Sequence, residues 1–253
     1  KVHTSEKVIE AWDAKAMPLI YHQTMYGGKC AVIAEIFEFQ KEWISSMVDG
    51  NTSFIEIGCG TAEMGSVLFQ KASYTVGLDI NQVFLDLATE LHPMMANCST
   101  NFLVQGNAAE TVPLLKSTLP SEFWDTKRIV SMLMNTFGIL PDNLRLAVIE
   151  QMLMLAGKDG VVVIGCFHSK SFERGIHEFY AHNPQLCGSI HDPEVLIDFE
   201  NANLVIPGTN YESHWFSIEE LSAYFNSELY DIRSHVHGVG VFLIVTAKPV
   251  MGK

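Results

Sequence analysis

Five short apolar segments, separated by amphipathic stretches, constrain the fold of this chain more than any other feature of its sequence. Most of them are rich in β-branched or aromatic residues, and they span residues 53–58, 74–80, 101–105, 128–134 and 160–166. Segments of this kind are typical of strands that are buried on both faces. Between them, apolar residues recur at helical spacing over residues 62–70, 81–96, 108–116 and 143–156. Strands that alternate with helices predict a parallel sheet joined by right-handed crossovers.

The last part of the chain has a different pattern. Two strand-like segments, 229–237 and 239–248, are joined near His237 and Gly238. A connection this short permits only an antiparallel hairpin. We therefore expect an α/β fold with a doubly wound, seven-stranded, mostly parallel sheet that ends in an antiparallel hairpin.

The segments outside this alternation divide the expected single domain, residues 1–253, into four parts. Residues 1–50 precede the first strand and have a helical pattern, which predicts a helical cap over the edge or mouth of the sheet. Residues 51–168 form the alternating core. Residues 169–216 contain Pro, Gly, Asn and several aromatic residues, and we interpret them as an insertion above the sheet. Residues 217–253 supply the last helix and the hairpin.

The charge balance argues against a nucleic-acid partner. Of 253 residues, 16 are Lys or Arg and 29 are Asp or Glu, so the formal net charge is −13. A protein that grips nucleic acid through its phosphates needs a basic face, and the longest basic run here is the pair Lys127–Arg128. No apolar run approaches the ~18 residues that span a membrane, so no membrane partner is expected. The sequence does not indicate an oligomeric state.

The cysteines and histidines predict neither a disulfide framework nor a metal site. There are five cysteines, an odd number, and no two of them form a Cys-x-x-Cys pair. A reducing compartment, the cytoplasm, fits this pattern best. The ten histidines, which include His235 with His237 and His191 beside Asp192, match no metal-binding spacing.

A glycine-rich turn follows the first predicted strand directly and opens a helix, with the sequence Glu56-Ile-Gly58-Cys-Gly60-Thr-Ala-Glu-Met-Gly65. Glycines let the backbone pass close to a ligand, and ligands of open α/β sheets bind at the carboxyl ends of the strands. The turn lacks the Gly-Lys-Ser/Thr of a P-loop, and its spacing fits the dinucleotide pattern GxGxxG poorly. S-adenosylmethionine carries no phosphate but needs a partner for its ammonium group, which an acidic residue such as Glu56 can help provide.

Polar residues end the next three predicted strands. Asp79 lies 19 positions after Gly60 and can accept hydrogen bonds from both ribose hydroxyls of a cofactor, or can cap the following helix. Asn107 can bond the edge of an adenine or cap the helix that begins at Ala108. Asn135 can contact both cofactor and acceptor, or be a plain turn residue.

Taken together, these residues resemble the class I S-adenosylmethionine-dependent methyltransferases, with the overall layout covering residues 52–248 and the specific motifs 53–138. The resemblance implies methyl transfer from S-adenosylmethionine. It further implies that Gly58 and Gly60 lie against the methionine part of the cofactor, that Asp79 holds the ribose, and that Asn107 with Ala108 contacts the adenine. The sequence departs from the family in having Asn107 where Asp is frequent. It also lacks the Asn/Asp-Pro-Pro-Tyr/Phe motif, which argues against amino-directed methylation of DNA or of protein glutamine.

Methyl transfer depends mainly on holding acceptor and methyl group in line, and it needs a base only when the acceptor must lose a proton. His168, which follows the fifth predicted strand, is the candidate base, and the alternative is a turn or capping histidine. Glu173, His177 and Tyr180 are spaced to share one helix face, which either lines a pocket or faces solvent.

Further candidates for the acceptor pocket lie in the cap and in the insertion. Tyr21 and Tyr26 can close over the site as a lid or pack against the sheet. Tyr211 and His214 precede a capping box formed by Ser217 and Glu220, and they suit an acceptor wall as well as core packing. We expect a small polar metabolite that is methylated on nitrogen or oxygen. The alternatives are a catalytically idle fold that binds the cofactor or a protein, and a nicotinamide-dependent oxidoreductase.

Overall fold

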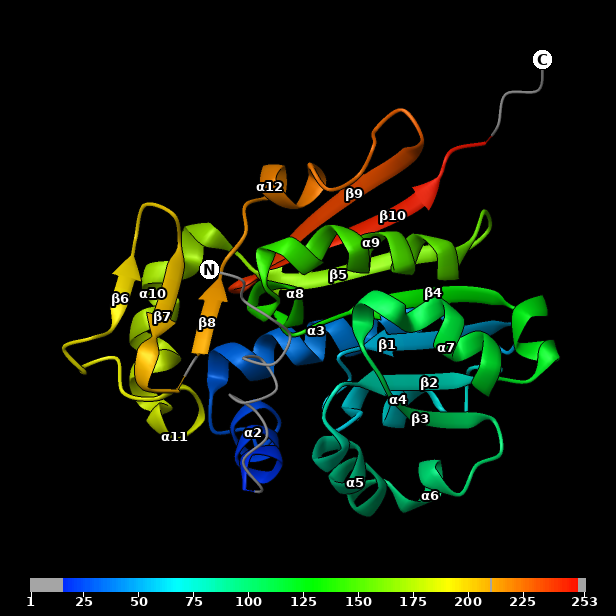
Figure 1. The fold of residues 1–253 in the computed structure, drawn as a ribbon, viewed down its shortest axis with the longest axis horizontal. Coiled ribbons are helices and arrows are strands. Elements are labelled where there is room, and N and C mark those ends of the chain that lie inside the picture. Colours follow the sequence, from blue (N-terminus) through cyan, green and yellow to red (C-terminus); the bar gives the residue numbers. More distant parts are fainter. Residues whose placement is uncertain (1–15, 210, 250–253) are drawn as a thin grey trace.

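The computed structural model describes residues 16–209 and 211–249, and its centre is a seven-stranded sheet (Figure 1). The strand order is β3-β2-β1-β4-β5-β10-β9; the first five strands are parallel, and β10 runs antiparallel to both of its neighbours. The predicted fold class is confirmed. The strands are β1 (Thr52–Ile57), β2 (Thr75–Asp79), β3 (Asn101–Gln105), β4 (Lys127–Met132), β5 (Val161–Phe167), β9 (Tyr230–His237) and β10 (Gly240–Ala247).

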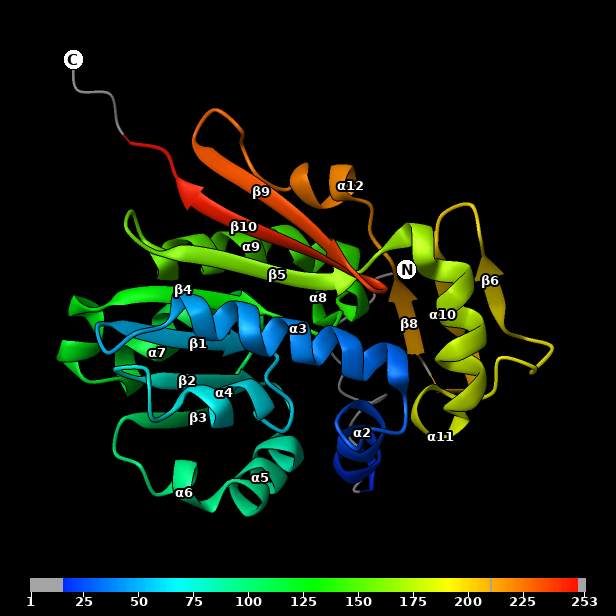
Figure 2. The ribbon, with the colours of Figure 1, turned by 180° about the vertical axis from the view of Figure 1, so that it is seen from behind.

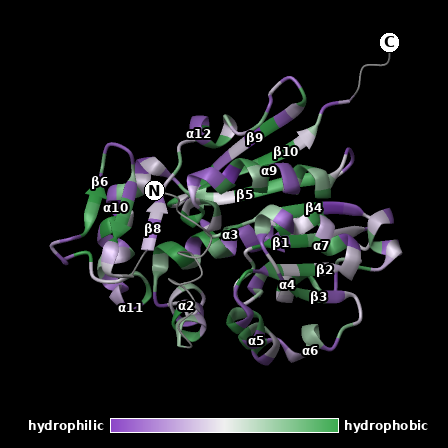
Figure 3. Ribbon diagram, viewed as in Figure 1, coloured by the Kyte–Doolittle hydropathy of each residue, from purple (hydrophilic) through white to green (hydrophobic). Residues whose placement is uncertain are grey.

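Helices cover both faces of the sheet, because the inner strands are apolar on both sides. Within β1, Phe54 belongs to the core on one face and Ile55 to the core on the other, as the alternation of side chains along a strand requires. The first face packs under α3 (Ala31–Met47) and α4 (Glu63–Leu68), and the second under α7 (Thr111–Thr118), α9 (Asp142–Ala156) and α12 (Ile218–Ser222) (Figure 2). Figure 3 shows the hydrophobic character of β5 and β10.

Three predicted element boundaries were wrong, each for a local reason. The helix predicted over residues 81–96 is two helices, α5 (Gln82–Leu91) and α6 (Pro93–Ala96), since a proline has no N–H to continue the first. The helix predicted from residue 108 begins as a 3₁₀ turn over Ala108–Glu110. Strand β4 ends at Met132 because Met134 and Asn135 have positive φ values of 52° and 63°; the chain then enters α8 (Thr136–Ile139).

Helix α2 (Met17–Met25) and the insertion lie beside the carboxyl ends of the parallel strands, whereas α3 covers a face of the sheet and not its edge or mouth (Figures 1 and 2). The described part of the cap consists of α2 and α3. The insertion contains α10 (Phe172–Glu178) and α11 (Pro184–Cys187). It also contains a separate antiparallel sheet, which the sequence did not predict, formed by β6 (Leu196–Asp198), β7 (Asn203–Ile206) and β8 (Tyr211–His214). No helix in the described residues is both long enough and apolar enough to cross a membrane.

Candidate functional site

A cavity opens at the carboxyl ends of the parallel strands, where the chain order changes direction between β1 and β4. Open α/β sheets bind ligands at this switch point. The cavity and its open mouth together hold about 1060 Å³ of space free of protein atoms. Residues from the loop after β1, the ends of β2, β3 and β4, the helix α2 and the insertion line it.

The loop after β1 approaches the cavity with its backbone. Gly58 and Gly60 both line the cavity and have φ values of +73° and +52°, a region that glycine tolerates best. A Cβ at Gly58 would lie 2.4 Å from Cγ2 of Thr136, so a larger residue does not fit there. The N–H groups of Gly58 and Cys59 donate to the carbonyl of Leu78, at 2.7 and 3.0 Å, and so fix the loop against β2.

Asp79 connects this loop to the end of β2 and also lines the cavity. Its Oδ2 accepts a hydrogen bond from the N–H of Gly60 at 2.9 Å, and its Oδ1 accepts one from the N–H of Asn81 at 3.0 Å. Burial raises the pKa of Asp79, and the two backbone donors oppose that shift. Asn81, and not Asp79, is the N-cap residue of α5. Asp79 therefore presents a fixed carboxylate to the cavity.

Glu56 lies in β1, two residues before Gly58, and only 6% of it is exposed. Among the described residues, its Oε2 atom is buried and has no hydrogen-bond partner. Burial raises the pKa of Glu56 to about 8, and the neighbouring carboxylates of Glu63 and Asp79 add to the shift. A buried carboxylate without a partner is costly, and either a proton or a cationic group relieves that cost.

Asn107 and Ala108 follow β3 and line the opposite end of the cavity from the insertion. The side chain of Asn107 accepts a hydrogen bond from the N–H of Ala109 at 3.0 Å, so the predicted capping role is present. Capping uses the side-chain oxygen and leaves the residue on the cavity surface, so the two roles proposed for it are compatible.

Asn135 is 2% exposed and links three elements at the floor of the cavity. Its Oδ1 accepts a hydrogen bond from the N–H of Phe167 at 3.0 Å, and its Nδ2 donates to Oγ of Ser213 at 3.0 Å. The end of β4 is thereby tied to β5 and to β8 of the insertion.

A buried polar network continues behind Asn135. Tyr180 donates to Oγ of Ser213 at 2.8 Å and accepts from Nε1 of Trp215 at 2.9 Å, so Tyr180 lies behind the cavity and does not line it. Tyr211 does line the cavity, and its hydroxyl hydrogen-bonds with Tyr180 and Ser213. Burial raises the pKa of Tyr180 to about 12 and that of Tyr211 well above its ordinary value.

Tyr21 and Tyr26 approach from α2. The ring of Tyr21 lines the cavity and packs edge-on against Phe84 at 5.5 Å and against Tyr26 at 5.9 Å. Tyr26 stands behind Tyr21 and is not part of the lining. The helix is also held by a polar contact that the sequence did not suggest, between Nδ1 of His22 and Oε1 of Glu63 at 2.9 Å.

Besides Tyr26 and Tyr180, the three predicted histidines also lie outside the cavity lining. His168 is buried at the end of β5, and its backbone N–H donates to the carbonyl of Val239. Burial lowers the pKa of its imidazole. His177 is exposed on α10. The shared face expected for Glu173, His177 and Tyr180 is wrong, because α10 ends at Glu178 and Tyr180 belongs to a separate 3₁₀ turn.

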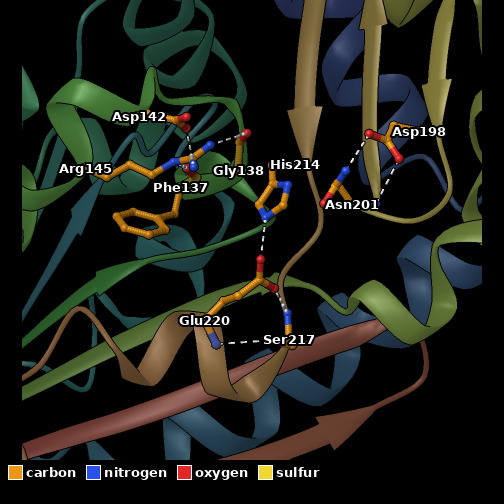
Figure 4. A network of polar contacts seen from close by, with 9 residues as sticks. All are labelled: Phe137, Gly138, Asp142, Arg145, Asp198, Asn201, His214, Ser217 and Glu220. Carbon is orange, nitrogen blue, oxygen red and sulfur yellow. Dashed lines mark hydrogen bonds and ion pairs between the residues drawn. The ribbon is translucent and has the colours of Figure 1, made fainter.

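His214, the third of these residues, lines a neighbouring polar cleft (Figure 4). Its Nε2 lies 3.3 Å from Oε1 of Glu220. In the same cleft, buried Arg145 donates to the carbonyls of Phe137 and Gly138 at 3.1 and 3.3 Å. This guanidinium therefore fixes the turn of α8, whose other side faces the main cavity.

The charges around the cavity have one sign. Of the described residues that line it, the ionisable ones are Asp79, Tyr21 and Tyr211, and none is Lys, Arg or His. Glu56, which was predicted to bind the cofactor, is buried in β1 two residues before Gly58 and is not itself part of the lining. Such surroundings suit a cationic ligand and offer no charged partner to a pyrophosphate. Among the described residues, no group of three or more His, Cys, Asp or Glu side chains is arranged to hold a metal ion.

Sequence reasoning missed the apolar lining. Met25, Phe179, Leu186, Ile139 and Leu144 all face the cavity, yet an isolated apolar residue carries no signal that separates a pocket wall from a core.

Comparisons with known proteins identify the fold. No protein-family model and no curated protein matches the chain. A solved S-adenosylmethionine-dependent methyltransferase from Anabaena variabilis is 13% identical, with a TM-score of 0.63 over 95% of both chains. Magnesium protoporphyrin IX methyltransferase from Synechocystis, solved with bound SAH, is 12% identical, with a TM-score of 0.59 over 96% of this chain and 100% of that one.

An rRNA methylase from Streptococcus thermophilus is also similar in structure. It is 7% identical, with a TM-score of 0.50 over 85% of this chain and 97% of that one. The chain therefore has the Rossmann-like fold of the class I S-adenosylmethionine-dependent methyltransferases, as its motifs indicated. These neighbours differ in the acceptors that their names state, so the fold alone does not identify an acceptor.

Proposed function

We propose that this chain is an enzyme that transfers a methyl group from S-adenosylmethionine to a nitrogen or oxygen atom of a small molecule. The observation that carries the proposal is the buried carboxylate of Glu56, which has no hydrogen-bond partner among the described residues and lies beside the glycine loop. The ammonium group of the cofactor's methionine part is the cation that such a carboxylate needs.

The other cofactor contacts follow from the geometry of the loop and the strand ends. Gly58 and Gly60 allow the methionine part to lie against the backbone. The fixed carboxylate of Asp79 accepts hydrogen bonds from the ribose hydroxyls. Asn107 and Ala108 border the adenine end. When bound, the cofactor supplies an electrophilic methyl group on a positively charged sulfur.

The residues of the chain contribute mainly by positioning the cofactor and the acceptor. The side chains of Tyr21 and Phe84 pack over the glycine loop, and a Cβ at Gly60 would lie 3.3 Å from the Tyr21 ring. Closing the site in this way excludes water and holds the acceptor in line with the methyl group. His168 lies outside the cavity lining, so we do not assign the proton transfer to it.

The surroundings of the cavity favour this function over the alternatives. A nicotinamide dinucleotide would bring two phosphates into a site whose described lining holds no Lys, Arg or His and does hold the carboxylate of Asp79. A nucleic-acid acceptor is disfavoured by the net charge of −13. A small-molecule acceptor and a cytoplasmic location remain predictions.

Calorimetric titration tests the cofactor directly. We expect S-adenosylhomocysteine to bind and NADH not to bind. Asp79→Ala should weaken S-adenosylhomocysteine by about 2 kcal/mol, or roughly thirtyfold, because it removes charge-assisted hydrogen bonds. The matched control is Asp86→Ala, an exposed aspartate on α5, which should bind like the wild type.

Two results would contradict the proposal. Binding of NADH alone would favour an oxidoreductase. Binding of S-adenosylhomocysteine without methyl transfer in a radiolabelled screen of pooled metabolites would favour the idle cofactor-binding fold.

A further inference from the structure

The half of the cavity farthest from β2 and β3 is lined by apolar and aromatic side chains. They come from α2, the end of β4, the end of β5, the insertion helices and β8, and we call them the acceptor wall: Met25, Met134, Phe167, Phe179, Leu186 and Tyr211. Each of the six is less than a tenth exposed. A ligand in this half must therefore leave most of its water behind.

The polar atoms of this half are already engaged within the protein. Asn135 uses its Oδ1 for the N–H of Phe167 and its Nδ2 for Ser213. The Tyr211 hydroxyl hydrogen-bonds with Tyr180 and Ser213 behind the wall. The wall thus presents rings and methyl groups, and it offers no dedicated partner to an acceptor rich in polar groups.

Charge excludes two further classes of acceptor. An anion would meet no Lys, Arg or His among the described residues of the lining, and it would share the cavity with the carboxylate of Asp79. A cation would meet no carboxylate on the acceptor wall, and the positive sulfur of the donor would repel it. Both would lose hydration without a partner.

Among the residues that the structure describes, the lining also holds no group suited to take a proton. Of its ionisable residues, Asp79 belongs to the cofactor half, while Tyr21 and Tyr211 are phenols whose pKa values are raised by burial. An acceptor that keeps its proton until the moment of transfer would need a base here. A nitrogen lone pair that carries no proton needs none.

From this geometry, and on the basis of the proposed function, we propose that the acceptor is an uncharged aromatic heterocycle that is methylated on a ring nitrogen carrying no proton. The nitrogen lone pair forms the N–CH₃ bond as the S–CH₃ bond breaks, and the electron pair of that bond goes to the sulfur. The positive charge moves from sulfur to nitrogen, and no proton is transferred.

General acid–base chemistry separates this class from alkyl amines. An imidazole has a pKa near ~6.5 and an alkyl amine one near ~10.4, so at pH 7 the uncharged fraction of the amine is smaller by about a thousandfold. The expected acceptor is therefore small, as the sequence suggested, but apolar apart from the reacting atom.

The test compares four bicyclic probes of one shape on the protein loaded with sinefungin, an unreactive analogue with an ammonium group in place of the sulfonium. The probes are isoquinoline, 1-naphthol, 1-naphthylmethylamine and 1-naphthoate. Ligand-observed NMR should show isoquinoline and naphthol binding at least about tenfold more tightly than the two charged probes. With S-adenosylmethionine, isoquinoline should be methylated at least about a hundredfold faster than naphthol at pH 7.

A substitution in the wall tests the same idea from the protein side. Leu186→Glu should bind naphthylmethylamine at least about tenfold more tightly than Leu186→Gln does. The glutamine variant keeps the size and polarity without the charge. Leu196→Glu, at a position 64% exposed on β6, is the control and should retain the wild-type order of probes.

The outcomes separate this inference from the proposed function. If sinefungin binds but a charged probe binds best, or neither neutral probe binds, or naphthol is methylated as fast as isoquinoline, the acceptor class is wrong and the cofactor assignment stands. If sinefungin and S-adenosylhomocysteine do not bind to the wild type, the proposed function itself is wrong.

Discussion

The two halves of the cavity are built in different ways. The cofactor half comes from three consecutive strand ends, near Gly58, Asp79 and Asn107, and backbone hydrogen bonds such as that from the Gly60 N–H to Asp79 hold it. The acceptor wall comes from segments as distant as Met25 and Tyr211, and contacts between side chains hold it. The first half should therefore tolerate no change of backbone, and the second should tolerate changes that leave the cofactor bound.

We expect the largest effect on cofactor affinity at Gly58, where the loop of the cofactor half has no room for a side chain. Gly58→Ala places a Cβ 2.4 Å from Cγ2 of Thr136 at a φ of +73°. A left-handed conformation alone costs about 1–2 kcal/mol, and the contact forces the loop to move. Calorimetry should show S-adenosylhomocysteine binding at least about a hundredfold more weakly, which corresponds to roughly 2.7 kcal/mol.

A second substitution separates contact from conformation. Gly58→Ala combined with Thr136→Ser removes the clashing Cγ2 and keeps the hydroxyl that donates to the carbonyl of Leu133. We expect the pair to recover about tenfold in affinity, a gain of roughly 1.4 kcal/mol. Wild-type affinity in Gly58→Ala itself would show that this half is not fixed by its backbone.

The next effect concerns the support of the acceptor wall. Ser213 is completely buried between Nδ2 of Asn135 and the hydroxyl of Tyr180. Ser213→Ala leaves Nδ2 of Asn135 without its acceptor and takes from the Tyr180 hydroxyl one of its partners, so it should lower the free energy of unfolding by about 2–3 kcal/mol, as measured by urea denaturation. Affinity for S-adenosylhomocysteine should stay within about threefold. A tenfold loss would mean that the two halves are coupled and would overturn the comparison.

The residues that we predict to bind the cofactor could be named from the sequence because the information that marks them is local. The turn from Glu56 to Gly65 and the aspartate at the end of β2 are short patterns whose spacing is set by one strand-turn-helix unit. The structure brings the predicted residues Gly58, Gly60, Asp79 and Asn107 to one cavity. The sequence could not predict that Oε2 of Glu56 lacks a hydrogen-bond partner among the described residues, because that depends on all the side chains packed around it.

The acceptor wall could not be predicted in the same way. Phe179 and Leu186 look like any core residues in the sequence, and the register that turns them towards Met25 is set by long-range packing. Conversely, His168, His177 and His214 were chosen for the chemistry of histidine, although no spacing in the sequence placed them in the site. The structure places all three outside the cavity lining. Polar residues near a strand end mark a region, but tertiary packing decides which side chains enter the cavity.

A smaller effect, in the cofactor half, depends on pH. The folded-state pKa of Glu56, about 8, is above the ordinary 4.5 of a glutamate. The stability that its retained proton confers on the empty protein is therefore complete below pH 4.5 and is lost as the pH rises towards 8. Pairing with the ammonium of the cofactor requires the ionised form of Glu56, so cofactor binding should release the proton of Glu56. The affinity should therefore increase as the pH rises from 6 to 7, by up to about tenfold.

Calorimetry in two buffers of different ionisation enthalpy measures that proton. Glu56→Gln should bind S-adenosylhomocysteine more weakly and with no such proton release, and its unfolding free energy should vary less between pH 5 and pH 8 than that of the wild type. Proton release that persists in Glu56→Gln would assign the titration to another group.

The smallest expected effect is on stability, at the N-terminus of α12, which belongs to neither half of the cavity. It serves as a reference for the larger effects. Ser217 and Glu220 form the capping box that their spacing predicted, with Oγ of Ser217 accepting from the N–H of Glu220 at 3.1 Å and Oε2 of Glu220 accepting from the N–H of Ser217 at 2.7 Å. Ser217→Ala removes one of these bonds at the N-terminus of α12 and should cost about 1 kcal/mol in urea denaturation. It is the matched control for Ser213→Ala, since it makes the same chemical change without burying an unsatisfied donor. If both serine variants lost equal stability, the buried network behind the acceptor wall would be no more important than a surface cap, and the distinction between the two halves would rest on the glycine loop alone.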